Sequence, residues 1–199
     1  MIGVSPRRVR RVAAHAPTST DRARFAVRKG RLDMRLLTLF RSKVIRRSLR
    51  EQPKLNLGLI AARAQLELAT ATPHSASVDA LRVHHELVAG LPGQALFIAA
   101  ALAFESLAEA LPYFDLSIKT AWQKLDDRLS RSEGEQALRL SRVATLGTEL
   151  LGSTDAGRRY LHTPNFALGG STPLELLKTA EGEQLVLTEL QTQAGGGPV

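Results

Sequence analysis

The chain has 199 residues, 44% of them hydrophobic, which is long enough for one sizeable hydrophobic core or two small ones. Its net charge of +8 is concentrated at one end, because the first 50 residues carry 15 of the 27 basic side chains and only 2 of the 19 acidic ones. That segment has a charge of +13 and the remainder a charge of −5. The absence of cysteine excludes disulfides, thiol nucleophiles and cysteine-based metal sites.

Neither a membrane span nor a secretory signal is expected. The longest uninterrupted apolar run, 95–104, is too short to cross a bilayer, which needs about 20 residues. Arginines from Arg7 to Arg31 interrupt the N-terminal apolar positions, which argues against a secretory signal. We therefore expect a cytoplasmic protein.

Residues 1–33 are rich in arginine and poor in large apolar side chains, so we expect a basic, partly disordered extension. Three interpretations stay open. The segment is a reading frame extended upstream of a start at Met34, an arm that binds nucleic acid or another anionic surface, or an arginine-rich targeting peptide.

Residues 34–78 are expected to form a helical N-terminal segment with a linker. Apolar residues recur at three- and four-residue steps over 34–49, with basic residues between them, which predicts one basic amphipathic helix. Such a helix lies on a membrane surface or packs against the rest of the protein. After Pro53, a second helix is predicted over 55–71, and 72–79 contains the Ser, Thr and Pro residues typical of a linker.

Every later periodic segment is helical and none alternates like a strand, which predicts an all-α fold. Two helices are expected over 79–89 and 93–103. A short helix ending near Leu111 and a second helix capped by Ser117 then have the proportions of a helix-turn-helix. We place this domain at 79–130.

The second of these helices has two distinct faces. One face is expected to point inward and consists of Ile118, Ala121, Trp122 and Leu125. The candidate DNA-binding residues are the cap and the opposite face, where a major-groove reader displays its polar groups: Ser117, Lys119, Thr120, Gln123 and Lys124. Asp126 and Asp127 count against DNA binding, since they place negative charge near an approaching phosphate. The alternative is a helical hairpin within a bundle, with Trp122 in the core rather than stacked on a base.

A longer helix is expected to follow. Ser130 and Glu133 fit a capping box that starts a helix, and Gly152 is suited to end it. Small and apolar residues form a narrow seam along this helix: Ala137, Leu140, Ala144, Gly147 and Leu151. Such a seam serves the core or self-association.

Local signals further along predict a compact helix–loop–helix. They are Asp155 as a first cap, 163–165 as the end of the first helix, Gly169 and Gly170 as a turn with positive φ, and Thr172, Pro173 and Glu175 as the capped start of the second helix.

The same segment resembles a known family. The residues that carry the resemblance are, in order, Arg-Tyr-Leu at 159–161, Thr-Pro-Asn at 163–165, Ala-Leu-Gly-Gly at 167–170, Thr-Pro-Leu-Glu-Leu-Leu at 172–177, Thr179 and Gly182. This order is similar to the toxin-binding domain of the Xre/MbcA/ParS antitoxins. Upstream, 116–120 and 128–130 occupy the places of that family's Xre-like helix-turn-helix and its following capped helix. The resemblance covers about residues 90–195.

The resemblance implies an Xre-like helix-turn-helix domain at 79–130, then a small helical toxin-binding domain at 131–199 with a flexible tail. It further implies the antitoxin of a type II toxin–antitoxin system. The toxin of such a system has a RES domain and degrades NAD⁺. The antitoxin neutralises the toxin by covering its active site. It also binds operator DNA to repress its own operon, and we expect a homodimer within a larger toxin–antitoxin complex.

The candidate toxin-binding residues are those of the motif expected to be exposed: Arg158, Arg159, Tyr160, Asn165, Phe166, Gly169 and Gly170. The two arginines are suited to contact an anionic rim of the toxin or a toxin site shaped for the phosphates of NAD⁺. The loop after them is expected to enter the active-site cleft of the toxin. Tyr160 stands where the family usually has Trp, and the segment after Ser117 has fewer basic residues than the family pattern.

No catalytic constellation is recognised. The five histidines lack metal-ligand spacing, and there is no Walker loop, dinucleotide fingerprint or nucleophile elbow. We therefore expect no enzyme activity, no metal and no cofactor. The alternative function is a helix-turn-helix transcriptional regulator without a toxin partner, motivated by the polar face after Ser117 and by the basic first 50 residues.

Overall fold

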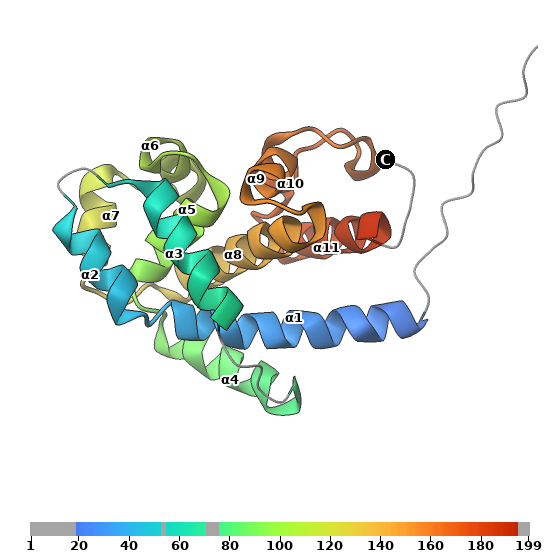
Figure 1. The fold of residues 1–199 in the computed structure, drawn as a ribbon, viewed down its shortest axis with the longest axis horizontal. Coiled ribbons are helices and arrows are strands. Elements are labelled where there is room, and N and C mark those ends of the chain that lie inside the picture. Colours follow the sequence, from blue (N-terminus) through green and yellow to red (C-terminus); the bar gives the residue numbers. More distant parts are fainter. Residues whose placement is uncertain (1–18, 53–54, 71–75, 195–199) are drawn as a thin grey trace, which may run out of the picture.

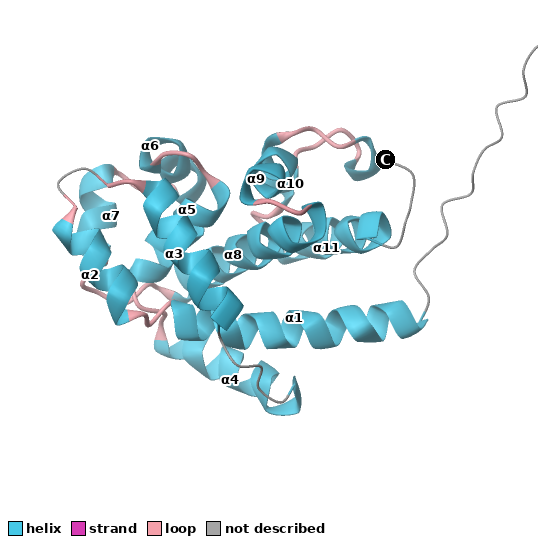
Figure 2. Cartoon of the chain, viewed as in Figure 1, coloured by secondary structure: helices cyan, strands magenta, loops and turns pink. Residues whose placement is uncertain are grey.

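The computed structural model describes residues 19–52, 55–70 and 76–194. This part of the chain folds into eleven α-helices and two short 3₁₀ helices without a strand, which confirms the all-α prediction (Figures 1 and 2). The elements are α1 (Ser19–Leu39), α2 (Lys43–Glu51), α3 (Leu57–Thr70), α4 (Ala76–Ala89), α5 (Gln94–Ala103), α6 (Leu107–Ala110), η1 (Leu111–Phe114), α7 (Ile118–Lys124), α8 (Arg131–Leu151), α9 (Thr154–His162), η2 (Phe166–Leu168), α10 (Pro173–Leu176) and α11 (Ala180–Ala194).

Helix α8 is the central element, and it contacts α1, α4, α5, α9 and α11. In Figure 1, α1 and α4 lie below α8, while α9 and α10 lie above it. Its predicted boundaries are confirmed. Ser130 and Glu133 form the capping box, and Gly152 ends the helix with φ of 86°. Because buried side chains from α1 through α11 form one continuous cluster, the four segments expected from the sequence share a single core.

The expectation of a disordered extension over 1–33 is wrong for 19–33, which form the first two thirds of α1. Leu32 is buried against the core and Asp33 pairs with Arg142 of α8. These partners lie more than 100 residues away in sequence, so the composition of the segment could not reveal them. Residues 1–18 lie outside the described residues.

The single helix expected over 34–49 is interrupted, because α1 ends at Leu39 and α2 begins at Lys43. The hydroxyl of Ser42 caps α2 by accepting a 3.1 Å hydrogen bond from the Ile45 amide. The Gln94 amide donates to the carbonyls of Phe40 and Ser42 at 2.7 and 3.1 Å, which ties the break to α5. Apart from Val44, which is exposed, the large apolar side chains of this segment lie in the core, as in the second of the two interpretations.

Helices α3, α4 and α5 confirm the remaining helices expected before residue 104, although α4 already begins at Ala76, within the expected linker. Residues 72–75 of that linker lie outside the described residues. Among the described helices, none is by itself long and apolar enough to cross a membrane. The one pair that passes on length and composition, α5 with 107–114, is bent by 102°.

Candidate functional site

A close contact between α8 and α9 positions the C-terminal candidate residues. The Cα of Gly157 on α9 lies against Gly147 on α8, and a Cβ at Gly157 would come within 2.9 Å of the Thr148 amide nitrogen. The seam of small residues along α8 therefore serves the core at this point. Ser153, rather than the predicted Asp155, caps α9 by accepting from the Ala156 amide, because Asp155 already lies in the first turn.

The loop between α9 and α10 is held by its own hydrogen bonds. The Asn165 amide donates to the Ser171 carbonyl at 3.1 Å, and the Gly170 amide donates back to the Asn165 carbonyl at 2.9 Å. The Asn165 side chain accepts a 2.9 Å hydrogen bond from the Ala167 amide. Gly169 and Gly170 adopt φ of 69° and 83°, which confirms the predicted turn. Asn165 and the two glycines thus shape the loop.

Phe166 lies at the tip of this loop with 98% of its surface exposed. It is the most exposed large hydrophobic side chain in the part of the chain that the structure describes. An aromatic ring exposed on a hydrogen-bonded turn is typical of an anchor for a partner. Burying such a side chain at an interface yields about 1.5–3 kcal/mol of free energy, which the free chain does not gain.

The three adjacent candidates on α9 have different environments. Arg158 is mostly buried and donates a 2.6 Å hydrogen bond to the Ala101 carbonyl at the end of α5, so it joins two helices. Tyr160 is half-buried, and burial together with the nearby Glu189 carboxylate raises its pKa. Arg159 is exposed. Of the three, only Arg159 is fully available to a partner.

A pocket of about 410 Å³ opens beside α9. It is lined by Asp155, Arg158, Arg159 and His162 of α9 and by Ala103, Glu105 and Glu109. His162 forms a 2.9 Å hydrogen bond with the Ala103 carbonyl at its floor. The lining carries both signs of charge. Among the described residues, no three His, Cys, Asp or Glu side chains come together in a way that could hold a metal ion.

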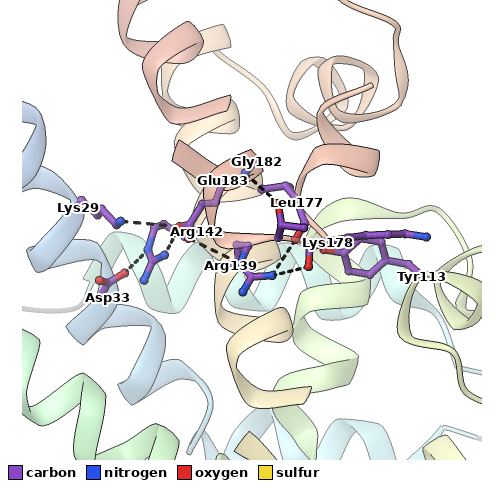
Figure 3. Close-up of polar contacts among 10 residues, drawn as sticks. Lys29, Asp33, Tyr113, Arg139, Arg142, Leu177, Lys178, Gly182 and Glu183 are labelled. Atoms are coloured by element: carbon purple, nitrogen blue, oxygen red, sulfur yellow. Dashed lines mark hydrogen bonds and ion pairs between the residues drawn. The ribbon is translucent and has the colours of Figure 1, made fainter. Parts of the chain in front are cut away.

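A buried ionic cluster holds the C-terminal helices onto α8, and it was not identified from the sequence (Figure 3). Arg142 of α8 pairs with Asp33 of α1 and with Glu183 of α11. Arg139, one turn earlier, donates to the carbonyls of Leu177 and Lys178 after α10. The available signal was the position of Arg142 four residues from Leu138 and from Leu146, which are both apolar.

The Tyr113 hydroxyl adds a further link, since it donates to the Leu177 carbonyl at 3.2 Å. Burial raises the pKa of Tyr113, so the phenol remains a neutral donor at physiological pH. The segment that carries α10 and α11 is therefore fixed both to α8 and to η1.

Short helices occupy the place predicted for a helix-turn-helix. Helix α6 continues into η1, Asp115 adopts a left-handed φ of 52°, and Ser117 caps α7 by accepting from the Thr120 amide. Trp122 packs on Phe97 with ring centroids 5.0 Å apart, so it belongs to the core rather than to a stacking surface. Whether this hairpin binds DNA stays a prediction.

The structure separates the candidate DNA-binding residues of α7. Lys119 and Gln123 are exposed, and Thr120 is half-buried, with its hydroxyl 2.8 Å from that of Ser117. Lys124 was expected to point outward, but it turns onto Glu133 in a 2.8 Å ion pair because that carboxylate lies at the start of the next helix.

Ile118 was expected to point inward, yet it is 58% exposed. It is the first residue of α7, where the helix has only begun to contact the core. Ala121 and Leu125 supply the buried face of α7 instead.

Asp126, which counted against DNA binding, is paired with two arginines of α2. The Arg46 guanidinium lies 3.2 Å from the Asp126 carboxylate, and Arg50 donates to the same oxygen. Hydrogen bonds from Arg50 and Arg46 hold the pKa of Asp126 below its ordinary value. Its negative charge is therefore balanced by the N-terminal segment.

Residues 146–196 match the family model of the antitoxin Xre/MbcA/ParS C-terminal toxin-binding domain. The matched range contains the loop of Phe166, the half-buried Tyr160 and the capped start of α10. No curated protein and no solved structure matches the chain.

Proposed function

We propose that the chain is an antitoxin whose target is a RES-domain toxin that degrades NAD⁺; the match of residues 146–196 to the antitoxin Xre/MbcA/ParS C-terminal toxin-binding domain supports this role. In this proposal the chain has no catalytic activity of its own. It acts in the cytoplasm by occupying the active-site cleft of the toxin.

The observation that carries the proposal is the exposure of Phe166. A planar apolar ring that stands clear of its own domain has the shape to enter a cleft that accepts the nicotinamide or adenine ring of NAD⁺. Arg159, which is also exposed, lies one α9 turn before the loop and is placed to contact the rim of such a cleft. Asn165, Gly169 and Gly170 then act by shaping the loop, and Arg158 and Tyr160 by positioning α9.

The proposal is tested by purifying the tagged full-length chain from its native host at moderate salt and identifying what co-elutes by mass spectrometry. The expected partner is a RES-domain protein in a fixed ratio to the chain. Once separated, that protein is expected to consume NAD⁺, and adding the chain back is expected to stop the reaction. A co-eluting protein that leaves NAD⁺ intact, or one that the chain does not inhibit, contradicts the proposal.

A second candidate function, repression of its own operon, is favoured by the surface of α7. Ile118, Lys119 and Gln123 are exposed on consecutive turns, and they offer one apolar and two hydrogen-bonding side chains to base edges. We propose that a homodimer of the chain presents two such helices to an operator with two half-sites. The same surface would serve a transcriptional regulator that has no toxin partner.

A further inference from the structure

Helix α2 presents four basic side chains to water within nine residues. Lys43, Arg46, Arg47 and Arg50 are all exposed, and with Glu51 they line a surface hollow of about 280 Å³. We call these four residues the α2 basic face. It lies outside the matched toxin-binding domain, so antitoxin binding to a toxin does not explain it.

The α2 basic face is carried by a firmly anchored helix. Ile45, Ser48 and Leu49 on the opposite side of α2 are buried. Ser42 caps the helix and also donates a 2.7 Å hydrogen bond to Glu67 of α3. The Gln94 amide ties the preceding turn to α5. The four cations are therefore held at a fixed place on the surface.

That place is beside α7. Asp126 comes two residues after the end of α7, and it accepts hydrogen bonds from Arg46 and from Arg50. Figure 1 shows α2 and α7 together at the same end of the molecule. Within the described residues, neither Lys43 nor Arg47 pairs with Asp126, and Arg47 forms one ion pair, an exposed one with Glu51 on its own helix. Exposed pairs of this kind are weak, so Arg47 is readily taken over by a phosphate.

We propose that the α2 basic face binds the phosphate backbone of operator DNA on the flank of the groove that α7 enters. The inference rests on the operator binding proposed above and adds a second element to it. Phosphate contacts position a protein on the duplex, while base contacts from a helix such as α7 specify the sequence. The four cations outnumber the single carboxylate of the hollow, Glu51, and Arg46 and Arg50 offset Asp126, although the neighbouring Asp127 stays exposed.

The buried side of α2 favours DNA over a membrane surface as the partner. A helix that lies in a bilayer interface inserts its apolar face between the lipids. Ile45 and Leu49 are 0% and 1% exposed, so the apolar face of α2 is already used by the core. Val44 is the one large apolar side chain of α2 that water reaches.

The test measures binding of the full-length chain to a duplex taken from immediately upstream of its gene, by fluorescence anisotropy between 0.05 and 0.3 M salt. A random duplex of equal length reports non-specific binding. The variant Lys43→Ala/Arg47→Ala is compared with Arg24→Ala/Arg31→Ala, which removes the same charge from exposed positions of α1. Asp126→Asn is the third variant, because it frees Arg46 and Arg50.

Losing two phosphate contacts is expected to reduce the slope of log affinity against log salt by about 1.8 and to weaken binding about 30-fold at 0.15 M salt. The α1 variant is expected to keep the slope of the native chain, and Asp126→Asn is expected to tighten binding. The inference is overturned by an unchanged slope for the α2 variant, by equal losses in the two double variants, or by a native chain that binds neither duplex. Binding to vesicles of anionic lipid in place of DNA also overturns it.

The native chain and the same variants are also tested as inhibitors of the co-purified toxin, by measuring how fast the toxin consumes NAD⁺. If the Lys43→Ala/Arg47→Ala variant still inhibits the toxin and binds DNA like the native chain, the α2 inference is contradicted and the toxin proposal is not. Absent inhibition by the native chain would instead count against the toxin proposal, whatever the DNA measurements show.

Discussion

The guanidinium of Arg142 donates a 2.6 Å hydrogen bond from Nε to Oδ1 of Asp33, a residue 109 positions earlier in the chain. The Nη1 atom of the same side chain pairs with Glu183. One arginine on α8 therefore fastens a helix from the N-terminal region and a helix from the C-terminal region to the same point of the core (Figure 3).

The substitution Asp33→Asn is expected to lower the free energy of unfolding by about 2 kcal/mol, because it removes one of two carboxylates that balance a buried cation. Urea denaturation measures this loss. Arg31→Ala, at an exposed position of the same helix, is the control and should change stability by less than about 0.5 kcal/mol. A shortened chain beginning at Met34 lacks Asp33 and is expected to be at least as destabilised. Equal stability of all these proteins would show that the pair contributes nothing.

Phe166→Ala is expected to weaken toxin binding about 30-fold, the effect of removing an interface residue worth about 2 kcal/mol. Because the ring is 98% exposed, the thermal stability of the free chain should not change. Titrating the inhibition of NAD⁺ consumption gives the affinity. Leu66→Ala is the matched control, since Leu66 is 66% exposed on α3, far outside the matched domain in sequence. Native affinity in the Phe166 variant would exclude this side chain as the anchor.

Two glycine substitutions are expected to act in opposite directions. A Cβ at Gly182 would lie 1.9 Å from the Leu176 carbonyl oxygen, so Gly182→Ala should destabilise the fold by about 3 kcal/mol. Gly30 lies within α1, and apart from its chain neighbours and the backbone of its own helix, no atom of the described residues lies within 4 Å of its Cβ position. Gly30→Ala should therefore stabilise the protein by about 0.5–1 kcal/mol. The melting temperatures of the two variants test this, and a shift in the same direction for both would contradict the predicted opposite effects.

The N-terminus of α8 is expected to be sensitive to acid. Burial opposes ionisation of Glu133, but hydrogen bonds from Lys124 and from Ser130 outweigh it and hold the pKa of Glu133 below its ordinary value of 4.5. An acid with a lowered pKa stabilises the fold above its unfolded-state pKa, and this contribution disappears as the pH falls through the folded-state value.

Urea midpoints at pH 6 and pH 3 test this. Glu133→Gln should have a lower midpoint than the native chain at pH 6 and a smaller difference between the two pH values. Glu181→Gln, at an exposed glutamate in the first turn of α11, serves as the control. Identical pH dependence in the native chain and the Glu133 variant would refute the role of this carboxylate.

Local signals predicted the boundaries of the C-terminal half well. Capping boxes at Ser130 and Thr172 and the turn at Gly169 and Gly170 use only neighbouring residues, and all are confirmed. The predictions that Ile118 points inward and that Lys124 points outward were wrong, because both orientations depend on which surfaces other helices leave uncovered.

The N-terminal half was harder to predict for the same reason. The helix over 19–33 depends on Arg142 and Glu149, which lie more than 100 residues away and become visible only in the folded chain. Likewise, Asp126 reads as a repulsive charge in the sequence, and only the position of α2 shows that it is balanced.

The hydrogen bonds around Asn165 also bear on the thermodynamics of association. Ordering a loop side chain when a complex forms costs about 0.5–1.5 kcal/mol, and ordering the backbone costs more. Here backbone hydrogen bonds and two glycines close the turn that carries Phe166, so folding has already removed the conformational entropy of its backbone. A partner that binds the ring therefore does not have to order the loop backbone, and the affinity of the complex is correspondingly higher.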